Sequence, residues 1–157
     1  MNEERLKSAD LKLAIIGLGY VGLPLAIEFG KKRSVVGFDI NNGLVAALNA
    51  SKSHIEGITD KTLAGFISSG AYSASTDAAV LDGCHVIVIA VPTPLDKDRK
   101  PDLAFIESAC KTIGENLKTP ALIINESTSF PGTVRNLIKP EIEKYSGGSI
   151  EHMYAVS

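Results

Sequence analysis

The feature that most constrains the fold is a glycine-rich turn that joins an apolar run to a helical pattern. Residues 11–16 (LKLAII) are almost all apolar, which is typical of a parallel strand buried on both faces. The run ends at Gly17-Leu18-Gly19-Tyr20-Val21-Gly22, and a helix is predicted over 21–29. Pro24 lies in the first turn of that helix, where its missing N–H is harmless. We therefore expect a strand, a tight turn and a helix in direct succession.

Strand and helix patterns alternate along the rest of the chain, and 86–91 (VIVIAV) is the strongest strand signal. Asp102 is expected to cap a helix that carries Phe105 among its apolar residues. The other strands are predicted at 34–39, 72–75, 121–125 and 150–156, and the other helices around 44–48, at 60–68, from 76 towards 81, and at 133–145. This alternation predicts an α/β fold, a Rossmann-like doubly wound parallel sheet in three layers, α/β/α. Ligands of such sheets bind beyond the carboxyl ends of the strands, where the strand order reverses.

Two helices carry more specific predictions. Val21, Leu25 and Phe29 share one face of the first helix, and Gly30 with the basic residues after it is expected to end that helix. Pro140 is expected to break the last helix.

Composition and charge argue against several classes of function. The 157 residues suit one domain, and a net charge of −2 with an isoelectric point near 5.9 favours neither nucleic acid nor an anionic membrane as a partner. No apolar run reaches the roughly 20 residues of a membrane span, and the first residues lack a secretory signal, so we expect a cytoplasmic protein. Cys84 and Cys110 are expected to be buried hydrophobes, and no metal site is expected from His54, His85 and His152.

The glycines match the G-x-G-x-x-G pattern of dinucleotide-binding turns. Gly17 permits the tight turn, Gly19 lets the backbone approach a pyrophosphate, and Gly22 lets the helix pack closely on the strand. The helix N-terminus then offers partial positive charge to the phosphates. The pattern alone is weak, and the alternative is a plain glycine turn; the flanking strand and helix favour a dinucleotide site.

Asp39 ends the second predicted strand, about 20 residues beyond the glycine loop, where an acidic residue accepts hydrogen bonds from ribose hydroxyls. Its charge would repel a 2′-phosphate, and Ile40, Asn41 and Asn42 provide no cation to attract one. The sequence therefore favours NAD over NADP. The alternative is an ordinary turn or helix-cap aspartate.

Two polar loops follow the next strands and are expected at the same edge of the sheet. The first is Val91-Pro92-Thr93-Pro94, in which the Thr93 hydroxyl is expected to face a ribose or nicotinamide. The alternative is a rigid loop without a ligand role. The second, at 125–132 (NESTSFPG), offers a carboxylate and three hydroxyls. Its alternative is a helix N-cap cluster, with Ser129 or Thr133 as the cap.

Together these segments resemble the UDP-glucose/GDP-mannose dehydrogenase superfamily, and most closely its bacterial UDP-N-acetylhexosamine (GlcNAc, GalNAc or ManNAc) 6-dehydrogenases of capsule and O-antigen synthesis. The matching stretches are 16–24, 28–32, 37–41, 91–96, 101–103, 126–128 and 131–133. Members oxidise a sugar-nucleotide C6 alcohol to a carboxylate with two NAD reductions, through a thioester on a cysteine. By this resemblance the cofactor-binding residues are Gly17, Gly19, Tyr20, Val21, Gly22, Asp39, Ile40, Val91, Pro92, Thr93, Glu126, Ser127 and Thr128.

The resemblance also implies limits. Thr128 would help to position a water and Glu126 is a catalytic candidate, but the family's nucleophilic cysteine, catalytic lysine and dimer-forming central helix come later than Ser157. Where members often carry a basic residue after the ribose-binding aspartate, this chain has Gly43 and Leu44, which implies weaker adenosine contacts. We therefore expect a polar tail over 1–10 and an NAD-binding domain over 11–157. This fragment would bind NAD without catalysis, and would meet the UDP-sugar only together with the missing half of a homodimeric enzyme.

Two alternatives remain at this point. One is the N-terminal domain of a 3-hydroxyacid or 6-phosphogluconate-type dehydrogenase, against which the loops around Thr93 and Thr128 argue. The other is a non-catalytic nucleotide-sensing module, which keeps the fold without the chemistry.

Overall fold

The computed structural model describes residues 10–148 and 150–157, so the predicted tail over 1–10 lies outside the described residues apart from Asp10. The strands are β1 (Leu13–Ile16), β2 (Val35–Phe38), β3 (Tyr72–Ser75), β4 (Val86–Ile89), β5 (Leu122–Asn125) and β6 (Met153–Val156). The helical elements are α2 (Gly22–Gly30), α3 (Asn42–Asn49), α4 (Asp60–Ser68), the 3-10 turn η1 (Ala78–Leu81), α5 (Ala104–Asn116), the π-helical turn η2 (Val134–Ile138) and α6 (Lys139–Ser146). Each predicted strand is therefore present; the strand at 72–75 has the predicted bounds, and the others are shortened at one or both ends.

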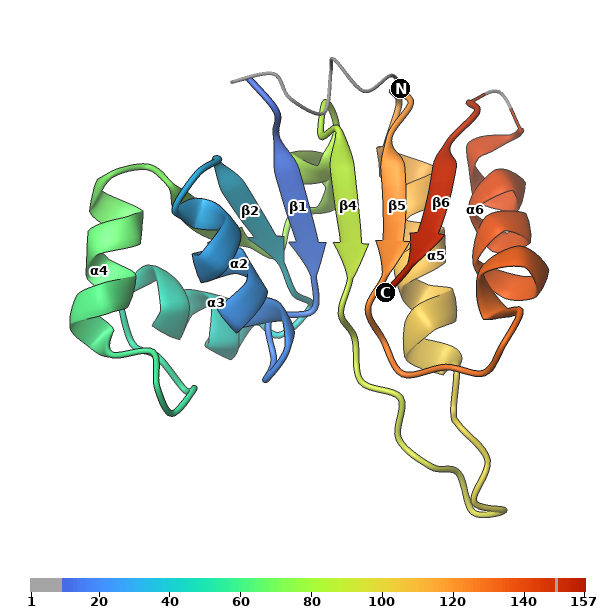
Figure 1. Cartoon of the computed structure of the whole chain (residues 1–157), viewed down its shortest axis with the longest axis horizontal. Helices are drawn as coiled ribbons and strands as arrows, with labels where there is room; N and C mark the ends of the chain where they lie inside the picture. Colours follow the sequence, from blue (N-terminus) through green and yellow to red (C-terminus); the bar gives the residue numbers. More distant parts are fainter. Residues whose placement is uncertain (1–9, 149) are drawn as a thin grey trace.

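The described strands form one six-stranded sheet in the order β3-β2-β1-β4-β5-β6, and every neighbouring pair is parallel. The chain leaves β1 towards β2 on one side and returns to β4 on the other, so the strand order reverses between β1 and β4. All strands point to the lower edge of the sheet in Figure 1, where the glycine loop and the two polar loops gather. The doubly wound fold predicted from the sequence is confirmed.

The two faces of the sheet are sealed by different helices. In β1, Leu13 and Ile15 belong to the core shared with α2, α3 and α4, whereas Ala14 and Ile16 belong to the core shared with η1, α5, η2 and α6. β4 repeats this alternation in register with β1. Because successive side chains of a strand point to opposite faces, an apolar residue at every position requires helices on both sides. Figure 1 shows α2 and α3 on one side of the sheet and α5 on the other.

The first helix presents a different face to the core from the one expected. Its buried residues are Gly22, Leu23, Ala26, Ile27 and Gly30, while Val21 and Phe29 are exposed. The register is set by the close approach of the first turn of α2 to β1, which directs this stripe onto the sheet.

The helix α2 ends at Gly30, as predicted, but not through a left-handed glycine turn. Gly30 is helical, and Lys31 after it keeps a right-handed φ of −64°. A Cβ on Gly30 would lie 3.0 Å from the ring of Phe66 in α4. This glycine therefore allows two helices to pack closely.

Pro140 does not break the last helix, because the chain passes through a π-helical turn into α6. The amide of Lys139 donates to the carbonyl of Val134, five residues earlier, and Pro140 falls in the first turn of α6. Proline has no N–H to donate. At this position, directly after the π-helical turn, that missing N–H costs the helix no hydrogen bond. The predicted break is therefore wrong, although the helical segment itself is present.

No helix in the described part of the chain is long and apolar enough to cross a membrane.

Removal of the Tyr72 hydroxyl on β3 is expected to raise the stability of the fold. Its side chain is 1% exposed, and its hydroxyl has no hydrogen-bond partner among the described residues. Burial raises the pKa of this phenol, and the nearby Asp39 carboxylate adds to the effect. Because an unpaired buried hydroxyl costs about 1–3 kcal/mol, Tyr72→Phe is expected to stabilise the chain by about 1 kcal/mol.

Urea unfolding of the two proteins measures this difference. The matched control is Tyr20→Phe, since Tyr20 is 81% exposed and its hydroxyl is expected to contribute nothing to stability. A Tyr72→Phe protein less stable than the wild type would show that the hydroxyl has a partner after all.

Candidate functional site

The glycine loop lies at the carboxyl end of β1, where the strand order reverses. Gly17 has a φ of +90°, and its amide donates to the carbonyl of Phe38 at 2.9 Å, so the loop is tied to the end of β2. A Cβ on Gly17 would lie 2.6 Å from the carbonyl oxygen of Ala90. Both the left-handed backbone and the close approach of the chain after β4 require glycine here.

The other two glycines of the motif differ sharply in their surroundings. A Cβ on Gly22 would lie 1.8 Å from the carbonyl oxygen of Gly17 and 3.2 Å from the side chain of Ile15, so helix and strand touch at this point. A Cβ on Gly19 would meet nothing within 4 Å. The fold therefore needs a glycine at 22, whereas the open space at 19 is available to a ligand.

The side chain of Asp39 accepts hydrogen bonds from the backbone of the glycine loop and of the turn after β2. Its Oδ2 accepts from the amide of Leu18 at 2.8 Å, and its Oδ1 accepts from the amide of Asn41 at 2.9 Å. The local turn that was the alternative for this residue is therefore present. A carboxylate has about four acceptor positions, so roughly two stay open to a ligand.

A first cavity of about 270 Å³ lies between this loop and α5. Two glycines of the loop, Asp39 and apolar side chains form its walls; the lining residues are Ile16, Gly17, Gly19, Phe38, Asp39, Ile40, Asn41, Leu44, Val91, Pro92, Phe105, Ser108, Ala109 and Thr112. An apolar slot with a carboxylate at one side suits a flat heterocyclic base joined to a sugar.

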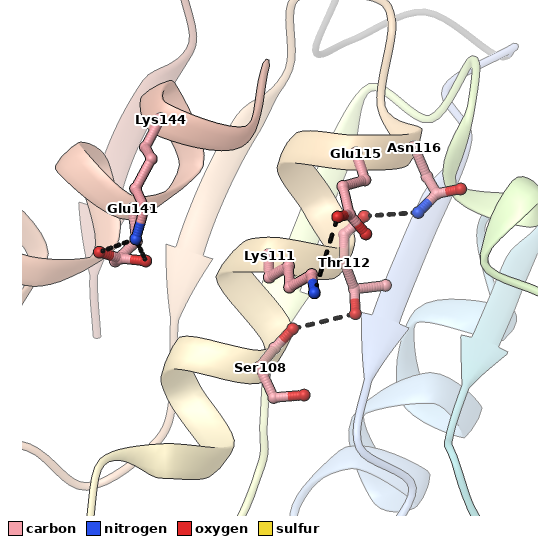
Figure 2. Close-up of polar contacts among 7 residues, drawn as sticks. All are labelled: Ser108, Lys111, Thr112, Glu115, Asn116, Glu141 and Lys144. Atoms are coloured by element: carbon pink, nitrogen blue, oxygen red, sulfur yellow. Dashed lines mark hydrogen bonds and ion pairs between the residues drawn. The ribbon is translucent and has the colours of Figure 1, made fainter. Parts of the chain in front are cut away.

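The contribution of α5 to this cavity was missed from the sequence. Phe105, counted there among the apolar residues of the helix, is 41% exposed and lines the cavity, with Ser108 and Thr112 on the same face. The hydroxyl of Thr112 donates to the carbonyl of Ser108 at 2.9 Å within the helix (Figure 2). The available signal was the pair of polar residues at helical spacing after Phe105, on a helix otherwise apolar on its inner face.

A second, larger cavity of about 1000 Å³ lies at the carboxyl end of β5. It brings together the loop predicted from the sequence and cations from the helix that follows; the lining residues are 125–135, Lys139, Tyr154, Val156 and Ser157. Glu126 is half-buried and Thr128 is exposed. Arg135, Lys139 and Tyr154 were not predicted as site residues, because only the packing of η2, α6 and β6 brings them to this loop.

The loop at 126–129 is fastened to the end of β4. The amide of Glu126 donates to the carbonyl of Ile89 at 2.9 Å, and the hydroxyl of Ser127 donates to the carbonyl of Val91 at 2.8 Å. The alternative of an N-cap cluster is wrong for Thr133, whose hydroxyl donates back to the carbonyl of Phe130 and makes no cap hydrogen bond.

Four of the predicted cofactor-binding residues lie outside both cavities, and one of them is Gly22, which is buried at the start of α2. Thr93 is half-buried in the loop after β4, and Tyr20 and Val21 are exposed at the start of α2. The ring of Tyr20 meets that of His54 edge-on, with centroids 6.5 Å apart.

Both cysteines are buried and free, as expected. Burial raises the pKa of Cys84 to about 11 and that of Cys110 to about 12. Since the thiolate is the nucleophilic form, neither side chain is prepared for nucleophilic catalysis.

Comparison with known proteins adds to this geometry. Residues 11–157 match the UDP-glucose/GDP-mannose dehydrogenase family, NAD binding domain. The UDP-N-acetyl-D-glucosamine 6-dehydrogenase of Pseudomonas aeruginosa is 44% identical over 138 residues, which are 88% of this chain and 32% of that protein. The UDP-N-acetyl-D-mannosamine dehydrogenase of Pyrococcus horikoshii is 37% identical over 131 residues, 82% of this chain and 31% of that protein.

Solved structures agree with these matches. A UDP-glucose dehydrogenase from Pyrobaculum islandicum superposes with a TM-score of 0.85 at 30% identity, covering 96% of this chain and 36% of that one. The UDP-D-ManNAc dehydrogenase from Pyrococcus horikoshii gives a TM-score of 0.83 at 35% identity, with 94% and 36% covered. The chain spans about a third of the length of the curated relatives it matches.

Proposed function

This chain belongs to the UDP-glucose/GDP-mannose dehydrogenase family as its NAD-binding domain, and we propose that it forms the NAD site of an enzyme that oxidises C6 of a UDP-N-acetylhexosamine. The sugar class is proposed from the relatives, which include UDP-N-acetylglucosamine and UDP-N-acetylmannosamine dehydrogenases. The observation that carries the NAD site is the open space at Gly19, next to a cavity with the Asp39 carboxylate in its wall.

In this proposal the first cavity takes the adenosine half of NAD. The base lies among apolar side chains that include Leu44 and Phe105, and the open acceptor positions of Asp39 take the ribose hydroxyls. The pyrophosphate passes over Gly19 towards the N-terminus of α2, where the helix dipole favours negative charge. Asp39 disfavours NADP because its charge repels a 2′-phosphate.

The second cavity takes the nicotinamide half and the reacting end of the sugar. NAD, when bound, accepts the hydride that leaves C6. Thr128 is exposed in the cavity wall, where its hydroxyl holds a water, and Glu126 supplies a carboxylate beside it. Arg135 and Lys139 bring positive charge to the same cavity, which favours an anionic substrate such as a nucleoside diphosphate sugar.

Catalysis in this proposal also needs regions like those that make up the rest of the relatives' length. The buried Cys84 and Cys110 do not serve as the thioester-forming nucleophile, so the 157-residue chain alone binds NAD without oxidising the sugar. The UDP-sugar and a homodimeric partner are then bound by the whole enzyme, in the cytoplasm. The family match leaves no support for a 3-hydroxyacid or 6-phosphogluconate-type dehydrogenase.

Calorimetric titration with NAD, NADP and ADP-ribose tests this proposal. We expect saturable NAD binding in the micromolar to millimolar range and at least tenfold weaker binding of NADP, a difference of about 1.4 kcal/mol or more. Absence of binding at millimolar NAD would refute the cofactor site, and equal affinity for NADP would refute the role of Asp39. NAD binding by an intact enzyme that never turns over UDP-N-acetylhexosamines would favour the nucleotide-sensing alternative.

A further inference from the structure

We propose that Ser127 is a positioning residue: it ties the loop at 126–129 to the end of β4 and so places the nicotinamide side of the site, without touching NAD. This inference rests on the proposed function, in which Glu126 and Thr128 face the nicotinamide. It assigns Ser127 a role different from the direct cofactor contact that the sequence suggests.

The proton of the Ser127 hydroxyl is already committed. The side chain is 8% exposed, and its Oγ donates to the carbonyl of Val91 at 2.8 Å, with the carbonyl of Ile89 at 3.4 Å on the same side. A hydroxyl carries a single proton, so donation to Val91 leaves none for a ligand. The residue is therefore built to join two loops.

The backbone of Ser127 is held as firmly as its side chain. Asn125, which is 3% exposed, donates its Nδ2 to the carbonyl of Ser127 at 3.0 Å and to the hydroxyl of Ser129 at 3.2 Å. Both the backbone and the side chain of Ser127 are therefore held by hydrogen bonds. Its neighbours on either side, Glu126 and Thr128, are the less buried residues that line the second cavity.

The loop at 126–129 depends more on the Ser127–Val91 hydrogen bond for its position than the segment around Val91 does. The chain leading to Val91 is already paired with β1, because the amide of Ala90 donates to the carbonyl of Ile16 at 2.8 Å. Beyond the amide of Glu126, by contrast, the hydrogen bonds that hold the 126–129 loop within the described structure come from the side chains of Asn125 and Ser127. Loss of the Ser127 hydroxyl therefore loosens the nicotinamide side more than the adenosine side, where Val91 lines the first cavity.

The test compares ligands that differ in the nicotinamide half. ADP-ribose binding is measured by calorimetry, and NADH binding by the change in nicotinamide fluorescence. For Ser127→Ala we expect about tenfold weaker NADH binding, because a loosened loop must be ordered again when the ligand binds, with ADP-ribose affinity within about twofold of the wild type. Ser127→Thr, which keeps a hydroxyl, is expected to recover most of the NADH affinity. Ser73→Ala, an exposed serine on β3 at the other edge of the sheet, is the control and should change neither ligand.

Equal losses for ADP-ribose and NADH in Ser127→Ala, or no loss for either, would overturn the positioning role. If Ser127→Ala does not fold, Ser127→Cys keeps the volume with a weaker donor and is expected to lose NADH affinity selectively, to a smaller extent. Failure of the proposed function is visible separately, since the wild type would then neither bind ADP-ribose nor change NADH fluorescence, and the positioning role would fall with it.

Discussion

Gly22→Ala is expected to destabilise the fold strongly and to abolish NAD binding, whereas Gly19→Ala is expected to impair NAD binding alone. At position 22 the new Cβ would lie 1.8 Å from the carbonyl oxygen of Gly17, a backbone atom that cannot swing aside. The helix α2 would have to move away from β1, which we expect to cost about 3 kcal/mol or more. For a chain of this size that corresponds to a fall in melting temperature of roughly 10 °C.

Gly19 is the matched control within the same motif. A Cβ there meets nothing within 4 Å, so the melting temperature of Gly19→Ala should stay within about 2 °C of the wild type. Its Cβ would occupy the space through which we propose the pyrophosphate passes, so NAD affinity should fall by about tenfold or more. Calorimetric melting and NAD titration of both variants measure the two effects. Wild-type NAD affinity in Gly19→Ala would show that the dinucleotide takes another path.

Asp39→Ala is expected to lower NAD affinity by about 100-fold, as for two charge-assisted hydrogen bonds to the ribose lost together. The substitution also removes the acceptor for the amide of Leu18, so the glycine loop loses a support. Asp39→Asn keeps the shape and one acceptor oxygen but removes the charge. We expect it to bind NAD about tenfold more weakly and to lose most of the discrimination against NADP, because the repulsion of the 2′-phosphate is gone.

A control for Asp39 exists at the opposite edge of the sheet. Asp82 also accepts from two backbone amides, those of Gly83 and Lys118, and it precedes β4 instead of following a strand. Asp82→Asn should therefore perturb a comparable local turn without any change in NAD or NADP affinity. Titration of both ligands into both variants separates loop support from ribose recognition. Retained discrimination against NADP in Asp39→Asn would contradict the proposed role of the charge.

The residues that the sequence identified correctly belong to short, contiguous patterns. The run that becomes β1, the turn at Gly17 and the start of α2 are consecutive, and each is dictated by local burial or backbone geometry. Asp39 was found by its distance from the glycine loop, because the length of a β-α-β unit varies little. These signals are local, so they can be seen without the rest of the chain.

Other features depend on which elements become neighbours. Phe105 belongs to an apolar helical pattern that does not show what it packs against. Only the tertiary placement of α5 opposite the glycine loop makes Phe105 part of the cavity wall. Val21 and Phe29 fit a helical period as well as Leu23 and Ile27 do. The contact of Gly22 with β1 determines which of these two faces of the helix is buried. Periodicity identifies a helix more reliably than it identifies the side that faces the core.

The sequence by itself determined the strand, glycine turn and helix around Gly17, the acidic residue at the end of β2, and the edge of the sheet at which the polar loops meet. Each of these follows from side-chain alternation, backbone conformation or the parallel direction of the strands. The tertiary structure alone decided that Ser127 donates to a carbonyl 36 residues earlier, and that α5 closes the first cavity. A hydrogen bond between distant segments is set by the packing of whole elements, and a serine in a polar loop carries no local sign of which partner it will find.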